Sequence, residues 1–188
     1  MRIIAGTAKG CTLKSLRGRA LRPTMDRVRE TIFAVLAPKI VGATFLDLFA
    51  GAGTVGLEAL SRGAVEAVFI ESHRPAGGVI RENAVRCGVA EQAVVITAPV
   101  PRGLAIMRQQ LRQFRIVYLD PPYDRGEVQG TMARLVQWPE LLEEGGVLVV
   151  QRSRHEEIPE QIGSFKRMKQ SRFGETIVDY YQRGGPAE

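Results

Sequence analysis

The chain has 188 residues, 45% of them hydrophobic, which is typical of one globular domain with its own core. Its 26 Lys and Arg against 20 Asp and Glu give a net charge of +6, which favours a polyanionic partner such as nucleic acid. No apolar run approaches the roughly 18 residues of a membrane span, and the first residues lack the apolar segment of a secretory signal. The composition therefore excludes a membrane protein and predicts a cytoplasmic monomer.

Metal-binding chemistry is not indicated by the residues that usually supply it. The chain contains two cysteines, Cys11 and Cys87, and two histidines, His73 and His155. The cysteines form no CxxC pair and have no histidine close to them in sequence, which argues against a zinc site. We therefore expect no metal, and we expect both cysteines to be free thiols in a reducing compartment.

Residues 1–40 are predicted to form a basic extension. Short segments at Arg2–Ile4 and Cys11–Leu16 predict a small hairpin, and Asp26–Leu36 has the apolar spacing of a helix. A single acid, Asp26, stands in residues 1–29 among eight basic residues: Arg2, Lys9, Lys14, Arg17, Arg19, Arg22, Arg27 and Arg29. Such a cluster is typical of a surface that contacts phosphates, and a solvated charged face is the alternative interpretation.

Residues 41–184 alternate short apolar runs with longer amphipathic stretches. The apolar runs predict strands at Ala43–Leu48, Ala67–Ile70, Ala93–Thr97, Arg115–Leu119 and Gly146–Gln151. The stretches between them predict helices near Thr54–Arg62, up to Arg86, over Arg102–Gln113 and over Glu127–Gln137. Continuous apolar runs are typical of strands covered on both faces, so the pattern predicts a doubly wound, mostly parallel α/β sheet.

The chain is expected to close with an antiparallel hairpin. The runs Phe165–Gln170 and Glu175–Tyr181 flank a turn at Gly174 and have strand-like composition. We expect a single domain over residues 1–184 and a disordered tail over residues 185–188.

One predicted helix has an unfavourable start. The stretch Ser72–Ile80 contains Pro75, Gly77 and Gly78, which weaken a helix. We therefore expect this helix to begin late or to be loose.

A glycine-rich turn follows the first predicted strand. Residues 45–56 read FLDLFAGAGTVG, with Gly51, Gly53 and Gly56 at the turn into the next helix. Glycines there let a ligand approach the backbone, and the free N–H groups of the helix start are donors. Glu71 ends the second strand, where a carboxylate can accept both hydroxyls of a ribose. This spacing alone is compatible with NAD and with S-adenosylmethionine.

The fourth predicted strand runs into the motif Asp120-Pro121-Pro122-Tyr123. In a doubly wound sheet the carboxyl ends of strands one and four flank the switch point where ligands bind, so we expect Asp120 to face the glycine loop. Two consecutive prolines fix the backbone and hold the Asp120 carboxylate and the Pro121 carbonyl rigidly. Tyr123 is expected at the mouth of this pocket.

These groups suit methyl transfer to an aromatic amine. The lone pair of such an amine is delocalised into the ring, which makes the nitrogen a weak nucleophile. A carboxylate and a carbonyl that each accept one N–H orient the amine and stabilise the positive charge developing on nitrogen. Tyr123 can stack on the base, a contact worth roughly 1–3 kcal/mol.

The motifs resemble those of a known family. Asp47–Gly56 and Asp120–Tyr123 together look like motifs I and IV of amino-group nucleic-acid methyltransferases. Arg2–Gly6, Arg22–Phe33 and Phe173–Thr176 extend the similarity over nearly the whole chain to the RsmD family of 16S ribosomal RNA (guanine-N2)-methyltransferases. The resemblance implies a class I, Rossmann-like methyltransferase fold, S-adenosylmethionine as cofactor, and 16S ribosomal RNA or the 30S subunit as partner.

The resemblance also implies roles for particular residues. Cofactor binding falls on Asp47, Phe49, Gly51, Gly53, Thr54, Glu71, Thr24 and Arg27. Catalysis falls on Asp120, Pro121 and Tyr123, and RNA contacts fall on Arg17, Arg19, Arg22, Pro122 and Tyr123.

Two positions depart from the family pattern. Met25 stands where relatives often carry serine, so a cap or ligand contact is expected to be absent there. Thr97-Ala98-Pro99 stands where many relatives place an acid or amide beside the adenine. We expect the adenine to be held by backbone groups and apolar contacts instead.

Several alternatives share parts of this pattern. Amino-methyltransferases of DNA adenine N6 usually carry a target-recognition insert, for which 188 residues leave little room. Methyltransferases of protein glutamine amides usually show Asn-Pro-Pro-Tyr. An NAD-dependent oxidoreductase would need a proton-transfer residue near the fourth strand, and a non-catalytic RNA-binding module would not need the glycine loop together with Glu71 and Asp120.

Overall fold

The computed structural model describes residues 1–15, 23–123 and 125–184, and for residues 23–25 only the helical backbone. Its helices are α1 (Pro23–Ile40), α2 (Thr54–Ser61), α3 (Arg74–Arg86), α4 (Val100–Gln109) and α5 (Glu127–Gln137), with short 3-10 helices η1 (Ala90–Gln92) and η2 (Pro139–Leu141). Its strands are β1 (Thr44–Leu48), β2 (Glu66–Glu71), β3 (Ala93–Thr97), β4 (Phe114–Leu119), β5 (Leu142–Ser153), β6 (Gln161–Ile162), β7 (Phe165–Phe173) and β8 (Thr176–Arg183).

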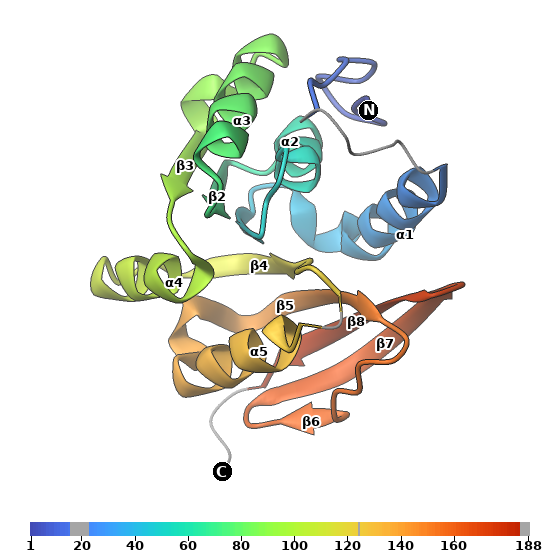
Figure 1. The fold of residues 1–188 in the computed structure, drawn as a ribbon, viewed down its shortest axis with the longest axis vertical. Helices are drawn as coiled ribbons and strands as arrows, with labels where there is room; N and C mark the ends of the chain where they lie inside the picture. The colour runs from blue at the N-terminus through green and yellow to red at the C-terminus, as the bar shows by residue number, and fades with distance from the viewer. Residues whose placement is uncertain (16–22, 124, 185–188) are drawn as a thin grey trace.

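The strands form one sheet in the order β3-β2-β1-β4-β5-β8-β7-β6. Strands β1 to β5 run parallel to one another, and β8, β7 and β6 add antiparallel strands beside β5. The chain leaves β1 in one direction toward β2 and β3 and later returns to β4 on its other side (Figure 1). This arrangement confirms the predicted doubly wound sheet with a closing hairpin, and it places the switch point between β1 and β4.

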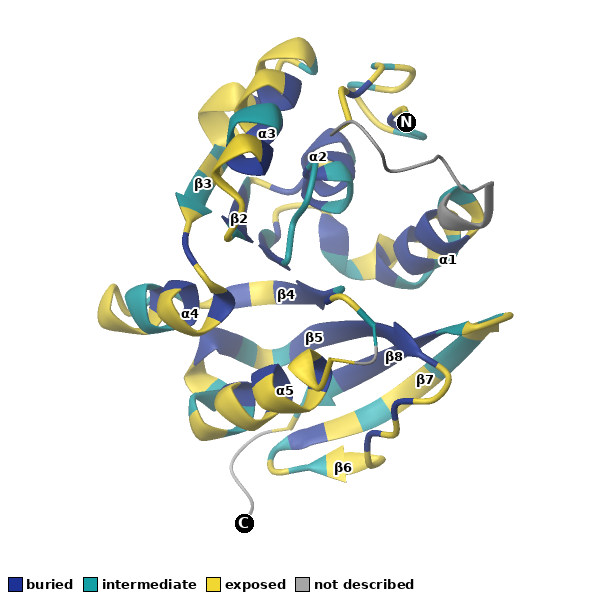
Figure 2. Ribbon diagram, in the orientation of Figure 1, coloured by how far each residue is buried: buried dark blue, intermediate teal, exposed yellow. Residues whose placement is uncertain are grey.

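Helices cover the two faces of the sheet. One apolar cluster joins α1, α2 and α3 to alternate residues of the central strands, among them Phe45, Phe69 and Tyr118. A second cluster joins α4 and α5 to the intervening residues, among them Leu48 and Leu119. Figure 2 shows β5 and β8 dark blue over most of their length, whereas β6 and β7 are largely exposed at the edge. Burial on both faces explains the continuous apolar runs of the inner strands.

Helix α3 is regular from Arg74 to Arg86, so the expectation of a late or loose start is wrong. Pro75 occupies the first turn, where its missing N–H removes no helical hydrogen bond. Gly77 is buried against β3, and a Cβ there would lie 2.9 Å from Thr97 Oγ1. The glycine that weakens the isolated helix therefore permits its close packing on the sheet.

Other boundaries shift for local reasons. Helix α1 extends beyond the predicted Asp26–Leu36 at both ends. Helix α4 begins at Val100 directly after Pro99 and ends at Gln109, four residues before the predicted end. Leu111 then adopts a left-handed conformation with a φ of 53°, which no helix tolerates in its interior.

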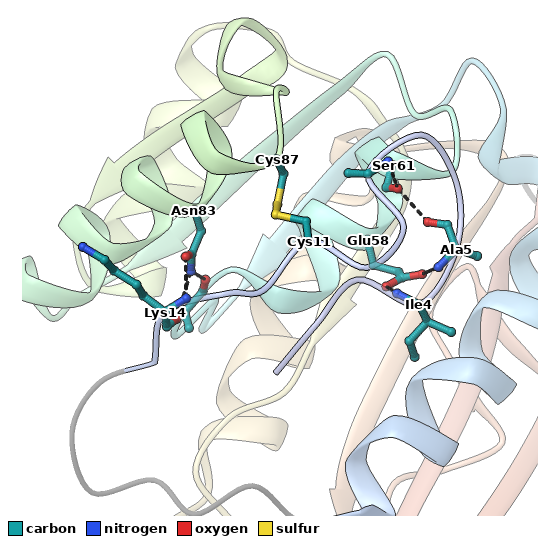
Figure 3. The surroundings of a disulfide bond; sticks show 10 residues. Ile4, Ala5, Cys11, Lys14, Glu58, Ser61, Asn83 and Cys87 are labelled. Atoms are coloured by element: carbon teal, nitrogen blue, oxygen red, sulfur yellow. Dashed lines mark hydrogen bonds between the residues drawn. A yellow bond between two sulfur atoms is a disulfide. The ribbon is translucent and has the colours of Figure 1, made fainter.

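The N-terminal segment, residues 1–15, packs against α2 and α3 (Figure 3). The predicted hairpin is reduced to a single antiparallel bridge between Arg2 and Thr12. Glu58 of α2 accepts hydrogen bonds from the backbone N–H groups of Ile4 and Ala5 at 2.8 and 3.0 Å. The segment thus obtains backbone partners both from its own two halves, as in the hydrogen bond from the Leu13 N–H to the Met1 carbonyl, and from side chains of the helices.

Cys11 and Cys87 form a disulfide, so the expectation of free thiols is wrong (Figure 3). Docking of the N-terminal segment brings Cys11 to the residue that follows α3, with a Cα–Cα distance of 5.8 Å, which a disulfide can bridge. The two residues are 76 positions apart, so their spacing alone did not reveal the pair.

None of the helices in the described part of the chain is long and apolar enough to cross a membrane.

Candidate active site

Three carboxylates converge where β1, β2 and β4 end. Asp47 lies near the end of β1, Glu71 ends β2, and Asp120 directly follows β4. Side chains alternate along a strand, so all three lie on the sheet face covered by α1, α2 and α3. The charges of Asp120 and Glu71 both raise the pKa of Asp47, so the three acids occupy one electrostatic site.

Asp47 is buried beneath the glycine loop, with an exposed fraction of 2%. The backbone N–H of Gly56 donates to Asp47 Oδ2 at 2.9 Å. Burial raises the pKa of Asp47 to about 8, the Gly56 hydrogen bond opposes this increase, and the charges of Asp120 and Glu71 add to it. The three carboxylates therefore repel one another, and a cationic ligand bound among them would stabilise their charged forms.

The turn between β1 and α2 depends on left-handed backbone conformations. Gly51 and Gly53 have φ values of 59° and 77°, and Phe49 shares this region with a φ of 61°. For a residue other than glycine such a conformation is uncommon and marks a constrained turn. The Phe49 side chain packs against the apolar cluster under α4 and α5. It therefore points away from the sheet face on which the three carboxylates lie.

Glu71 braces this loop. The Gly51 N–H donates to Glu71 Oε2 at 2.8 Å, and the His73 N–H donates to Glu71 Oε1 at 2.7 Å. Each carboxylate oxygen has a second acceptor position, so Glu71 can still accept ribose hydroxyls. The contact with Gly51 was not part of the sequence prediction.

Gly56 has a packing role. A Cβ at Gly56 would lie 2.3 Å from Phe69 Cε1 and 3.1 Å from Asp47 Oδ2. The third glycine of the motif therefore allows α2 to approach β2 and to present its N–H to Asp47.

This charge pattern fits S-adenosylmethionine better than NAD. A sulfonium and an ammonium group would each be attracted by the three carboxylates, whereas a pyrophosphate would be repelled. The left-handed glycines and the Glu71 carboxylate fit the methionine and ribose portions respectively, as the motif predicts. Asp47, Gly51, Gly53 and Glu71 would hold the cofactor.

The Asp120-Pro121-Pro122-Tyr123 motif lies beside this site at the switch point. Pro121 is buried, Pro122 is exposed and Tyr123 is half-buried. The Tyr123 hydroxyl lies 3.1 Å from Thr176 Oγ1 and accepts a hydrogen bond from Gln151 Nε2 at 3.2 Å. Burial raises the pKa of Tyr123, the hydrogen bond with Thr176 lowers it, and the charge of Asp120 raises it.

The sequence analysis did not identify three polar residues in and around the site, namely Gln151, Asn83 and Thr176. The Tyr118 hydroxyl donates to Gln151 Oε1 at 3.0 Å, which connects β4 to β5. Asn83 of α3 donates through Nδ2 to the carbonyl of Ala52, inside the glycine loop, at 3.1 Å. The late sequence match at Phe173–Thr176 was the one signal that pointed to Thr176, and Gln151 and Asn83 looked like ordinary polar residues.

The remaining predicted residues lie on α1 and α2 or outside the described part of the chain. Thr54 begins α2, and its hydroxyl lies 3.4 Å from Met1 Sδ. Arg27 is exposed on α1, and Thr24 lies in the same helix. Arg17, Arg19 and Arg22 lie outside the described residues. Within the described ranges, no group of three or more His, Cys, Asp or Glu side chains could hold a metal ion.

The fold and this site define a class I methyltransferase. The C-terminal domain of precorrin-6Y C5,15-methyltransferase from Rhodobacter capsulatus shares the fold, with a TM-score of 0.66 and 19% identity over 90% of this chain and 93% of that one. The hypothetical protein TTHA0928 from Thermus thermophilus is more similar, with a TM-score of 0.82 and 30% identity over 97% of this chain and 99% of that one.

Sequence comparison then identifies the family. A family model described as "Conserved hypothetical protein 95" matches residues 1–182. The Escherichia coli K12 protein named ribosomal RNA small subunit methyltransferase D is 33% identical over 188 residues, which is 100% of this chain and 92% of that protein. The chain belongs to this family, the RsmD family of methyltransferases.

Proposed function

We propose that the protein transfers the methyl group of S-adenosylmethionine to the exocyclic N2 amine of a guanine in 16S ribosomal RNA. The observation that carries this proposal is the position of Asp120 and Pro121 at the switch point, in the same electrostatic site as the Asp47 and Glu71 carboxylates around the glycine loop. Family membership supports the substrate class, because the Escherichia coli relative carries the small-subunit ribosomal RNA in its name.

In this proposal the bound cofactor supplies an electrophilic methyl group on a sulfonium. The Asp120 carboxylate and the Pro121 carbonyl each accept one N–H of the guanine amine, so its lone pair points toward the methyl group. The same two acceptors stabilise the positive charge that develops on nitrogen during transfer. Tyr123 stacks on the guanine, which must leave its RNA hairpin to reach the pocket.

The positive charge and the family membership support the proposed RNA contacts and cellular compartment. Arg17, Arg19, Arg22 and Arg27 would contact RNA phosphates near the site, and Pro122 would touch the flipped nucleotide. We propose that the protein acts as a monomer in the cytoplasm, on free 16S RNA or on an assembling 30S subunit.

The experiment that tests this function combines the purified protein with tritiated S-adenosylmethionine and unmodified 16S RNA or 30S particles. Nucleoside analysis should recover the label as N2-methylguanosine, and the better of the two substrates would show the stage of assembly at which methylation occurs. Label on adenine N6 in a DNA substrate or on a protein glutamine, with none on guanine, would refute the assignment of substrate while retaining the reaction.

A further inference from the structure

A chain of hydrogen bonds links buried side chains of β4 and β5 to the Tyr123 hydroxyl of the Asp-Pro-Pro-Tyr motif. The Tyr118 hydroxyl donates to Gln151 Oε1 at 3.0 Å, and Gln151 Nε2 donates to the Tyr123 hydroxyl at 3.2 Å. The Tyr123 hydroxyl also contacts Thr176 Oγ1 at 3.1 Å. Gln151 and Tyr118 are buried, with exposed fractions of 7% and 3%, so water does not substitute for these partners.

The orientation of the Gln151 amide links the two tyrosines. An amide presents a carbonyl on one side and an NH2 group on the other. The Gln151 carbonyl accepts the Tyr118 proton, so the NH2 group faces the Tyr123 hydroxyl.

We propose that Gln151 is a positioning residue of the methyl-transfer site: its Nε2 group, together with Thr176 Oγ1, fixes the Tyr123 ring from below, and Tyr118 orients the Gln151 amide by donating to its Oε1. This inference rests on the proposed role of Tyr123. Gln151 acts through Tyr123 and is not assigned a contact with the cofactor or the substrate.

The first test is Gln151→Met, which keeps the length of the side chain and removes both hydrogen bonds. We expect kcat for RNA methylation to fall by about 10–100-fold, the range typical of misplaced catalytic groups. The Kd for S-adenosylmethionine, measured by calorimetry, should not change. Gln182→Met is the matched control, since Gln182 lies in the same sheet and pairs with Val147, remote from the motif; it should retain wild-type kcat.

The second test separates positioning through Tyr123 from a general structural effect. If Gln151 acts through the Tyr123 hydroxyl, Gln151→Met should cost less in a Tyr123→Phe background than in the wild type. Additive losses in kcat would contradict this. Should Gln151→Met fail to fold, Thr176→Val at a half-exposed position removes the other partner of the same hydroxyl; a kcat equal to wild type would then refute the need to fix Tyr123.

The outcomes distinguish this inference from the proposed function. A wild-type protein that binds S-adenosylmethionine but labels no guanine refutes the function itself. An active wild type with a fully active Gln151→Met variant leaves the function intact and refutes only the role of Gln151.

Discussion

Asp47 shows the energetic cost of this site most directly. It is buried beside two other acids and receives one backbone hydrogen bond, from Gly56. Burying a carboxylate without a cation is unfavourable, and burial with the neighbouring charges raises the pKa of Asp47 from 3.8 to about 8. A cationic cofactor would lower this cost, so we expect the site to be less stable empty than occupied.

The pH dependence of stability should report this cost. An acid whose pKa is higher in the folded than in the unfolded state binds its proton more tightly when folded, so its contribution to the free energy of unfolding declines as the pH rises from 3.8 through about 8. Asp47→Asn keeps an acceptor for Gly56 and cannot ionise. Urea unfolding of both proteins from pH 4 to pH 9 should show Asp47→Asn gaining stability over wild type as the pH rises, by about 1.4 kcal/mol for each pH unit up to about pH 8. Parallel curves would contradict a raised pKa.

Asp120 should matter for the reaction rather than for cofactor affinity. Asp120→Ala removes an acceptor that the target amine requires, so kcat should fall by about 10²–10³-fold, the loss seen when one preorganised group is removed from a transition-state site. Binding of S-adenosylmethionine, measured by calorimetry, should be nearly unchanged. A variant that retains most of its kcat would exclude the proposed role of Asp120.

Residues that act through the chemistry of their own side chains could be predicted from the sequence. Residues that act by positioning a neighbouring residue could not. Asp47, Glu71 and Asp120 stand at strand ends within recognisable motifs, so alternation and topology were enough to bring them together. Gln151 lies near the end of β5 and looks like a surface glutamine in a one-dimensional pattern. Its importance follows from Tyr118 and Tyr123, which the fold alone places on either side of it.

At the scale of elements, the strands were predicted more accurately than the segments that join them. The inner strands are set by continuous apolar runs, which are local in sequence. The N-terminal segment takes its partners from Glu58, Ser61 and Asn83, all more than 50 residues away. Distant side-chain partners leave no periodic signal, so a hairpin was the nearest local interpretation.

The Cys11–Cys87 disulfide should stabilise this docking in a redox-dependent manner. It joins residues 76 positions apart, and such a cross-link contributes about 2–4 kcal/mol. Cys11→Ser should therefore lower the free energy of unfolding by that amount under oxidising conditions, measured by urea denaturation. With dithiothreitol present, the wild type and the variant should converge. Equal stability under both conditions would indicate that the thiols do not pair in solution.

At the scale of the whole molecule, positive charge is concentrated at one end of the chain. We propose that the acids of the site hold the cationic cofactor, whereas the arginines at positions 17, 19, 22 and 27 contact RNA phosphates. Long-range attraction of this kind depends strongly on salt. The overall charge could be predicted from composition alone.

Salt dependence tests this separation of charge. Replacing Arg17, Arg19 and Arg22 with alanine should weaken RNA binding and reduce the slope of log K against log salt by about 0.7–0.9 for each phosphate that the protein no longer neutralises. A control that changes net charge equally uses Arg108, Arg112 and Arg115, each paired with a glutamate elsewhere on the molecule. The control should leave the slope nearly unchanged. Equal effects from the two triple variants would mean that net charge alone attracts the RNA.

The docking of the N-terminal segment also has a consequence for folding order. Ile4 and Ala5 bind Glu58, Lys14 binds Asn83, and Cys11 pairs with Cys87 (Figure 3). During synthesis the segment leaves the ribosome before the helices that hold it, which are complete only after residue 86. Contacts between distant parts of a chain form slowly, because a long loop must close before they contribute. Residues 1–15 are therefore made before their partners but reach their native positions late, and a nascent chain halted before α3 carries this segment without its partners.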